Sequence, residues 1–305
     1  MTIAPEAPVT PAPLTFIELE ITGRCQLSCS HCYAESGPTK GHGTMTVGDW
    51  RRVIDEAAAL GVETAQFIGG EATMHPDFVE LVGHALDAGL RVQVFSNLYR
   101  VSPPLWALFE RPGVSLATSY YSDDAAEHDE LTGRAGSHTR TRAAIVEAVE
   151  RGIRLKVGII RMREGQRTEQ ARSEMEALGV DRVTVDRERA VGNAARTEAL
   201  PSTSELCGGC ADGKAAILPD GTVAPCVLGR FLPAGNVKGP GGLAAVLDGK
   251  QWAQVAASIP RPRRQRAGCT PDEDSCQPSP GMGCNPDSDG SDCSPAETEA
   301  CEPSY

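Results

Sequence analysis

Long apolar runs and aromatic residues are scarce in this sequence of 305 residues. What is missing argues against a membrane-spanning or a secreted protein. No apolar stretch approaches the eighteen residues of a membrane-spanning helix, so we expect no membrane partner. The first thirteen residues are rich in proline and lack the basic start and apolar run of a secretory signal peptide. Eleven cysteines without such a signal favour a reducing cytoplasm and metal ligation over disulfides.

Basic residues are absent from Ala267 to the end, where nine acidic residues lie. The whole chain carries a formal net charge of −12, yet residues 1–266 hold 32 acidic and 29 basic residues and are close to neutral. This balance argues against a nucleic-acid partner, because binding a duplex requires an excess of basic side chains.

Strand and helix patterns alternate along the first two hundred residues. Alternating or apolar strand patterns are followed by helices that end at glycines, which makes roughly six β-α units in succession. This order predicts an α/β fold, a partial (β/α)6 barrel similar to a TIM barrel, with its active site at the carboxyl ends of the strands. The expected strands lie at 16–21, 64–68, 90–95, 114–119, 153–160 and 180–185.

Three cysteines, Cys25, Cys29 and Cys32, follow the first expected strand with the spacing C-x3-C-x2-C. So short a loop can bring three thiolates together but not easily a fourth, which on a four-iron cluster leaves one iron open for a small molecule. The alternative is a zinc site that includes His31, but tetrahedral zinc needs four closing ligands and no further cysteine pair follows within a hundred residues.

The C-x3-C-x2-C motif resembles the signature of the radical S-adenosylmethionine (SAM) superfamily. That resemblance implies a [4Fe-4S] cluster on Cys25, Cys29 and Cys32 whose open iron binds SAM. It also implies that one electron cleaves SAM to a 5′-deoxyadenosyl radical, which abstracts a hydrogen atom from the substrate. The electron donor would be a flavodoxin or a ferredoxin.

Polar residues follow the later strands at the same end of the expected barrel, and the resemblance gives them roles around SAM. Gly69, Gly70 and Glu71 resemble the family's GGE motif, in which the acid accepts a hydrogen bond from the SAM ammonium group. Arg134 resembles the base that pairs with the SAM carboxylate, although a surface arginine would fit the sequence as well. The remaining candidates are His31, near the adenine or else a surface histidine, Ser96 and Asn97, near the ribose or else turn residues, and Ser119.

A second cysteine group, Cys207, Cys210 and Cys226, spans a hairpin that turns at Pro219-Asp220-Gly221. A helix is expected from about Leu243 to Ala257. This region resembles the SPASM domain, a C-terminal extension that holds auxiliary [4Fe-4S] clusters.

Five Cys-x-Pro units form the tail, at spacings of seven to nine residues. The alternatives are a disordered acidic linker or a chain that wraps a cluster, and the regular cysteines favour ligands. With the three hairpin cysteines they would complete one or two auxiliary clusters. The tail cysteines are Cys269, Cys276, Cys284, Cys293 and Cys301.

These observations divide the chain into a disordered N-terminus (1–13), a barrel (14–200), a SPASM-like domain (201–260) and the cysteine-rich tail (261–305).

SPASM-bearing radical SAM enzymes mostly modify ribosomally made peptides, by crosslinking, thioether formation or epimerisation. The resemblance therefore implies a precursor-peptide substrate, with a small molecule such as an aminoglycoside as the alternative. Only 24 residues precede Cys25, so we expect any leader peptide to be bound by a separate protein. A non-catalytic iron–sulfur or zinc protein is a further alternative, but it would need neither the GGE motif nor an open iron.

Overall fold

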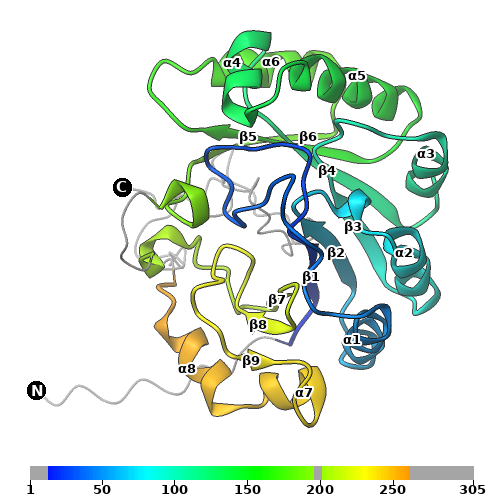
Figure 1. Cartoon of the computed structure of the whole chain (residues 1–305), viewed down its shortest axis with the longest axis vertical. Coiled ribbons are helices and arrows are strands. Elements are labelled where there is room, and N and C mark those ends of the chain that lie inside the picture. The colour runs from blue at the N-terminus through cyan, green and yellow to red at the C-terminus, as the bar shows by residue number, and fades with distance from the viewer. Residues whose placement is uncertain (1–12, 196–200, 262–305) are drawn as a thin grey trace, which may run out of the picture.

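A computed structural model describes residues 13–195 and 201–261 of the chain. Its first part is a curved sheet of six parallel strands with helices on the outer face, the partial barrel that the sequence predicts (Figure 1). The strands are β1 (Phe16–Thr22), β2 (Thr64–Gly69), β3 (Arg91–Phe95), β4 (Val114–Tyr120), β5 (Leu155–Arg161) and β6 (Arg182–Arg187). The helices are α1 (Val47–Ala59), α2 (Phe78–Asp87), α3 (Pro103–Phe109), α4 (Ala125–Thr132), α5 (Ser137–Glu150) and α6 (Thr168–Ala177).

Strand β1 is buried along its whole length because it lies in the middle of the sheet. Ile17, Leu19 and Ile21 join the hydrophobic core, whereas Glu18 and Glu20 lie on the opposite face, which the period of two of a strand requires. The buried carboxylate of Glu20 pairs with Arg230, whose Nη1 lies 2.9 Å from Oε2. Glu18 likewise accepts a hydrogen bond from Val227 N at 2.7 Å, so both buried carboxylates join β1 to residues 227–230.

The second part of the chain continues the same sheet. Strand β7 (Lys214–Ile217) pairs in parallel with β1, and β8 (Thr222–Ala224) and β9 (Gly235–Asn236) follow as antiparallel strands. The expected hairpin at Pro219-Asp220-Gly221 is present between β7 and β8. The single helix expected over 243–257 is instead two, α7 (Gly242–Leu247) and α8 (Lys250–Ser258), because Asp248 and Gly249 separate them and the backbone of Gly249 is extended.

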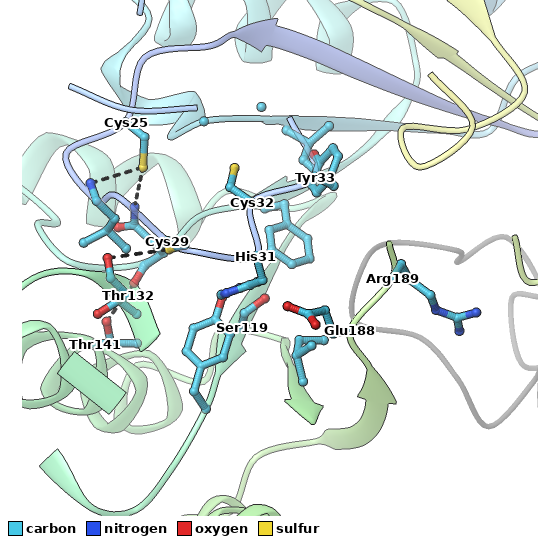
Figure 2. A pocket seen from close by; sticks show the side chains of 18 of the residues that line it. Cys25, Cys29, His31, Cys32, Tyr33, Ser119, Thr132, Thr141, Glu188 and Arg189 are labelled. Atoms are coloured by element: carbon cyan, nitrogen blue, oxygen red, sulfur yellow. Dashed lines mark hydrogen bonds between the residues drawn. The ribbon is translucent and has the colours of Figure 1, made fainter. Parts of the chain in front are cut away.

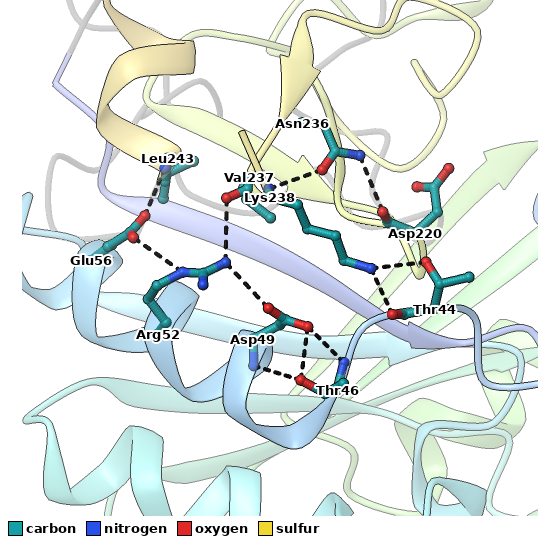
Figure 3. Close-up of polar contacts among 10 residues, drawn as sticks. All are labelled: Thr44, Thr46, Asp49, Arg52, Glu56, Asp220, Asn236, Val237, Lys238 and Leu243. Carbon is teal, nitrogen blue, oxygen red and sulfur yellow. Dashed lines mark hydrogen bonds and ion pairs between the residues drawn. The ribbon is translucent and has the colours of Figure 1, made fainter. Parts of the chain in front are cut away.

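Polar contacts fasten this second part to α1 and to the loop before it (Figure 3). The carboxylate of Glu56 accepts a hydrogen bond from the first turn of α7, at 2.6 Å from Leu243 N. Lys238 Nζ donates to the Thr44 carbonyl at 2.6 Å. Gly242 must be glycine here, since its φ is +58° and a Cβ atom would stand 2.4 Å from the Glu56 carboxylate. These contacts hold the hairpin against the barrel.

Candidate functional site

The loop after β1 brings Cys25, Cys29 and Cys32 to one cavity at the carboxyl ends of the parallel strands (Figure 2). The cavity opens to solvent, and together with its open mouth it encloses about 960 Å³. Its walls also include Gly69, the last residue of β2, and Gly70, which follows it. This edge of the sheet is where the sequence predicts the active site, because every parallel strand ends there.

Two of the three sulfur atoms accept hydrogen bonds from amide groups, whereas the Cys29 thiol donates to the Thr132 carbonyl at 3.7 Å. Cys25 Sγ accepts from Leu27 N at 3.4 Å and from the Asn97 side chain at 3.5 Å, and Cys32 Sγ accepts from Ser36 N at 3.3 Å. Burial raises the pKa of Cys25 to about 12, and the nearby charges of Glu71 and Cys32 act in the same direction. A cationic iron cluster would reverse this preference and favour the thiolates, and the amide donors suit thiolate ligands. Cys25 and Cys32 therefore fit a cluster as they stand, and Cys29 would exchange its hydrogen bond to Thr132 for an iron ligand bond.

Two segments far away in the sequence clamp the cysteine loop, and the sequence analysis missed both. At the end of α4, the Thr132 carbonyl accepts from Ser28 N at 3.1 Å. After β6, Asn193 N donates to the Cys32 carbonyl at 2.9 Å and its side chain donates to the Cys29 carbonyl at 3.1 Å. Nothing in the local pattern around Asn193 indicates this role, because the contact depends on how the barrel curves.

The backbone of the GGE motif lies against the end of β1 and the start of the cysteine loop. A Cβ atom at Gly69 would stand 2.3 Å from the carbonyl oxygen of Thr22, the last residue of β1, so this position requires glycine. The Glu71 carboxylate is buried and accepts from Asn97 N at 2.8 Å and from the Thr73 hydroxyl at 2.7 Å. Burial raises the pKa of Glu71. Glu71 thus joins the end of β2 to the end of β3, and its contact with the SAM ammonium group stays a prediction.

Of the polar residues expected after β3 and β4, Asn97 and Ser119 line the cavity. Ser96 does not, and its hydroxyl accepts from Leu98 N at 3.1 Å in a local turn. His31 lines the cavity, with its Nε2 2.9 Å from the Tyr121 hydroxyl. Burial lowers the pKa of His31 to about 4, so its imidazole is neutral at physiological pH.

Arg134 lies at the exposed surface beside the cysteine loop and not in the cavity lining. Its Nη1 donates to the Gln26 carbonyl at 3.0 Å, and its guanidinium stacks 4.6 Å from the centroid of the Tyr99 ring. Binding of the SAM carboxylate by Arg134 stays a prediction. In the structure the side chain contacts Gln26 and Tyr99 at the surface.

Glu188 and Arg189, just beyond the end of β6, are further lining residues that the sequence analysis did not single out (Figure 2). Arg189 Nη2 pairs with the buried Asp186 carboxylate at 2.8 Å. Burial raises the pKa of Asp186 to about 6 although the arginine opposes this effect. Glu188 and Arg189 therefore bring charged side chains to the same cavity that the cysteine loop lines.

The second cysteine group is brought together as expected. The sulfur atoms of Cys210 and Cys226 lie 2.6 Å apart, and Cys207 interacts with Cys210. Arg261, after α8, donates to the carbonyls of Gly208 and Cys210 and so holds this loop. A cluster bound here would require the touching sulfurs to separate. The tail cysteines 269, 276, 284, 293 and 301 lie outside the described residues, so their assignment stays a prediction.

Within the described ranges, no three His, Cys, Asp or Glu side chains converge as ligands of one metal ion would. A four-iron cluster attaches each cysteine to a different iron and so keeps their sulfurs farther apart than a single zinc ion does. A cluster therefore does not require the close convergence of side chains that a single metal ion requires. In the same part of the chain, no helix is long and apolar enough to cross a membrane.

Residues 19–170 match a family model that is described as the radical SAM superfamily. A PqqA peptide cyclase from Ruegeria pomeroyi is 30% identical over 277 residues, which cover 75% of this chain and 71% of that protein. A PqqA peptide cyclase from Rhodopseudomonas palustris is 32% identical over 123 residues, which cover 40% of this chain. That match spans only a third of the relative, 33% of its length.

Solved structures share the fold. Streptococcus suis SuiB bound to the precursor peptide SuiA gives a TM-score of 0.68 at 14% identity, over 81% of this chain and 68% of that one. The enzyme anSMEcpe with bound AdoMet gives 0.61 at 11% identity, over 80% and 82% of the two chains. Both likenesses extend past the barrel into the cysteine-bearing hairpins, which matches the expected SPASM-like architecture.

Proposed function

This chain belongs to the radical SAM superfamily, and from that membership we propose that it uses SAM to abstract a hydrogen atom from a ribosomally made peptide. The observation that carries the proposal is the convergence of Cys25, Cys29 and Cys32 on the cavity at the carboxyl ends of the strands. A four-iron cluster on these thiolates supplies, when bound, the electron and the open iron site that convert SAM to methionine and a 5′-deoxyadenosyl radical.

The chain's own residues position the two reactants. Asn97 and Ser119 line the cavity, and we assign them to the hydroxyl groups and methionine part of SAM. Asn97 would exchange part of its present contacts with Cys25, Gln26 and Tyr99 for SAM. The neutral His31 and its partner Tyr121 offer flat surfaces against which an adenine ring can pack. Gly69 and Gly70 present backbone rather than side chains to the same space.

A peptide substrate is supported by the names of the relatives. Several of the curated relatives, including the one that covers 75% of this chain, are PqqA peptide cyclases, although a heme synthase and a nucleotide dehydratase are also similar over shorter stretches. The similar solved structures include SuiB with its precursor peptide. We propose the same substrate class for this chain, with a crosslink, a thioether bond or an epimerised residue as the product. The auxiliary clusters on Cys207, Cys210, Cys226 and the tail are part of this proposal, as is a separate leader-binding protein.

The first experiment is anaerobic reconstitution with iron and sulfide, followed by an assay for 5′-deoxyadenosine with SAM and dithionite. The wild-type protein should form 5′-deoxyadenosine, and replacing Cys25, Cys29 and Cys32 together with alanine should abolish it and remove about four irons. The matched control replaces Cys207, Cys210 and Cys226 with alanine and should keep those four irons. A wild-type protein that binds iron but forms no 5′-deoxyadenosine would refute the proposed activity.

The second experiment identifies the product with a short peptide encoded beside the gene. A crosslink or thioether bond should appear as the loss of two hydrogens by mass spectrometry. Epimerisation should leave the mass unchanged in H2O and introduce one deuterium in D2O. A peptide that emerges unaltered by both measures, from an enzyme that forms 5′-deoxyadenosine, would point to a small-molecule substrate.

A further inference from the structure

Two exposed arginines stack on one tyrosine at the surface beside the cysteine loop. The guanidinium carbon of Arg134 lies 4.6 Å from the centroid of the Tyr99 ring, and that of Arg140 lies 4.9 Å away. Neither arginine forms an ion pair with any carboxylate in the described ranges, although most arginines there do. Stacking on an aromatic ring holds a guanidinium in place while leaving its charge available.

Asp129, on the preceding helix α4, directs its carboxylate to backbone and hydroxyl donors and not to either guanidinium. The Asp129 carboxylate accepts hydrogen bonds from Gly136 N, from His138 N at 2.8 Å and from the Ser137 hydroxyl at 2.9 Å. These donors occupy both of its oxygens. Both guanidinium groups are exposed and lie outside any ion pair of the described residues, so their charges are available to a partner at the surface.

This surface is joined to the cysteine cavity by a short series of contacts. Tyr99 N donates to Asn97 Oδ1 at 2.9 Å, and Asn97 Nδ2 donates to Cys25 Sγ at 3.5 Å. On the other side, Arg134 Nη1 donates to the carbonyl of Gln26, the residue after Cys25. Because electron transfer between proteins weakens steeply with distance, a carrier that docks here would place its redox centre close to Cys25.

We propose that Tyr99, Arg134 and Arg140 form the docking surface for an acidic one-electron carrier protein of the flavodoxin or ferredoxin class. The inference rests on the proposed function, which requires an electron at the cluster of Cys25, Cys29 and Cys32. In the step, the reduced carrier loses one electron and the cluster gains it, with no bond formed and no proton transferred. Complementary charge would steer the carrier and set its orientation, which is the usual effect of exposed charges on association.

The test compares two reductants that deliver the same electron. Arg140→Glu should slow 5′-deoxyadenosine formation supported by purified reduced flavodoxin, by about three- to tenfold at low flavodoxin concentration, and should weaken the dependence of that rate on salt. Formation supported by dithionite, which needs no docking surface, should stay at the wild-type rate. Position 140 lies in the first turn of α5, where a carboxylate is favourable, so the fold should tolerate the change.

Binding gives a readout that does not depend on turnover. The dissociation constant of oxidised flavodoxin, measured by fluorescence titration, should rise in Arg140→Glu and rise less in Arg140→Gln, which removes the charge without reversing it. The matched control is Arg154→Glu, the same reversal at an exposed arginine before the amino end of β5, at the edge of the sheet opposite the cavity. This control should match the wild type.

The outcomes separate the two proposals. Unchanged flavodoxin-supported turnover and binding in Arg140→Glu would overturn the docking surface, as would an equal loss in Arg154→Glu or an equal loss of dithionite-supported turnover. A wild-type protein that forms no 5′-deoxyadenosine even with dithionite would overturn the proposed function and the docking surface with it.

Discussion

Gly70 lies so close to Arg24 that a Cβ atom on residue 70 would stand 2.4 Å from the Arg24 carbonyl oxygen. The same carbonyl accepts a hydrogen bond from Glu71 N at 2.8 Å. The end of β2 and the start of the cysteine loop are thus in direct backbone contact, and the spacing between them is set by the missing side chain.

We expect Gly70→Ala to separate these two segments, because the atom it would strike belongs to the backbone and not to a flexible side chain. The free energy of unfolding should fall by about 1–3 kcal/mol, and less iron should be retained after reconstitution. Thermal denaturation and an iron assay measure the two effects. Gly41→Ala is the control, since a Cβ atom at Gly41 meets nothing within 4 Å. Equal stability and iron content in the two variants would contradict the close approach.

Glu71 should be tested with two substitutions because its carboxylate already accepts hydrogen bonds from Asn97 and Thr73. Glu71→Ala leaves these donors without partners and should cost about 1–3 kcal/mol of stability. If Glu71 also contacts SAM, the SAM dissociation constant should rise by about ten- to a hundredfold. Glu71→Gln keeps an acceptor for the donors but loses the charge. Unaltered SAM affinity in Glu71→Gln, measured by equilibrium dialysis, would limit Glu71 to joining the two strand ends.

Asp186 predicts a pH dependence of stability. Burial raises the pKa of this carboxyl group from 3.8 in the unfolded chain to about 6 in the folded protein. Between these two pH values the folded protein therefore keeps a proton on Asp186 that the unfolded chain has released. Stability should therefore fall as the pH rises from about 4 to 6, by at most about 3 kcal/mol, and then level off. Urea denaturation of the metal-free protein at several pH values measures this slope. Asp186→Asn should flatten it, and an equal slope in this variant would assign the effect to another group.

The tail should contribute to cluster binding. Outside the first cysteine motif, residues 1–266 contain only Cys207, Cys210 and Cys226, so a fully ligated auxiliary cluster needs a fourth ligand. We propose a tail cysteine, with Cys269 the first candidate as the nearest along the chain. Truncation after Arg266 should lower the iron content and the turnover of the peptide, and it retains Arg261, which holds the Cys207–Cys210 loop. Full iron content and full turnover after truncation would assign the Cys-x-Pro units another role.

The sequence predicted the order of strands and helices and the edge of the sheet that carries the site. Both depend on patterns within short segments, such as the alternating strand at 16–21 and the glycines at which helices end. It did not predict α4, whose apolar pattern is weak, or the pairing of β7 with β1, which joins residues two hundred positions apart.

What the sequence by itself determined is the kind of chemistry, because three cysteines at a set spacing in one loop need no tertiary context to form a ligand set. Only the tertiary structure decided which residues surround them. Curvature of the sheet brings Asn193 to the carbonyls of Cys29 and Cys32, and it brings Thr132 to Ser28. The same packing turns Arg134 to the surface beside Tyr99 and leaves Asn97 in contact with Cys25. Such contacts arise from segments that are distant in the chain, and no local pattern of residues encodes their meeting.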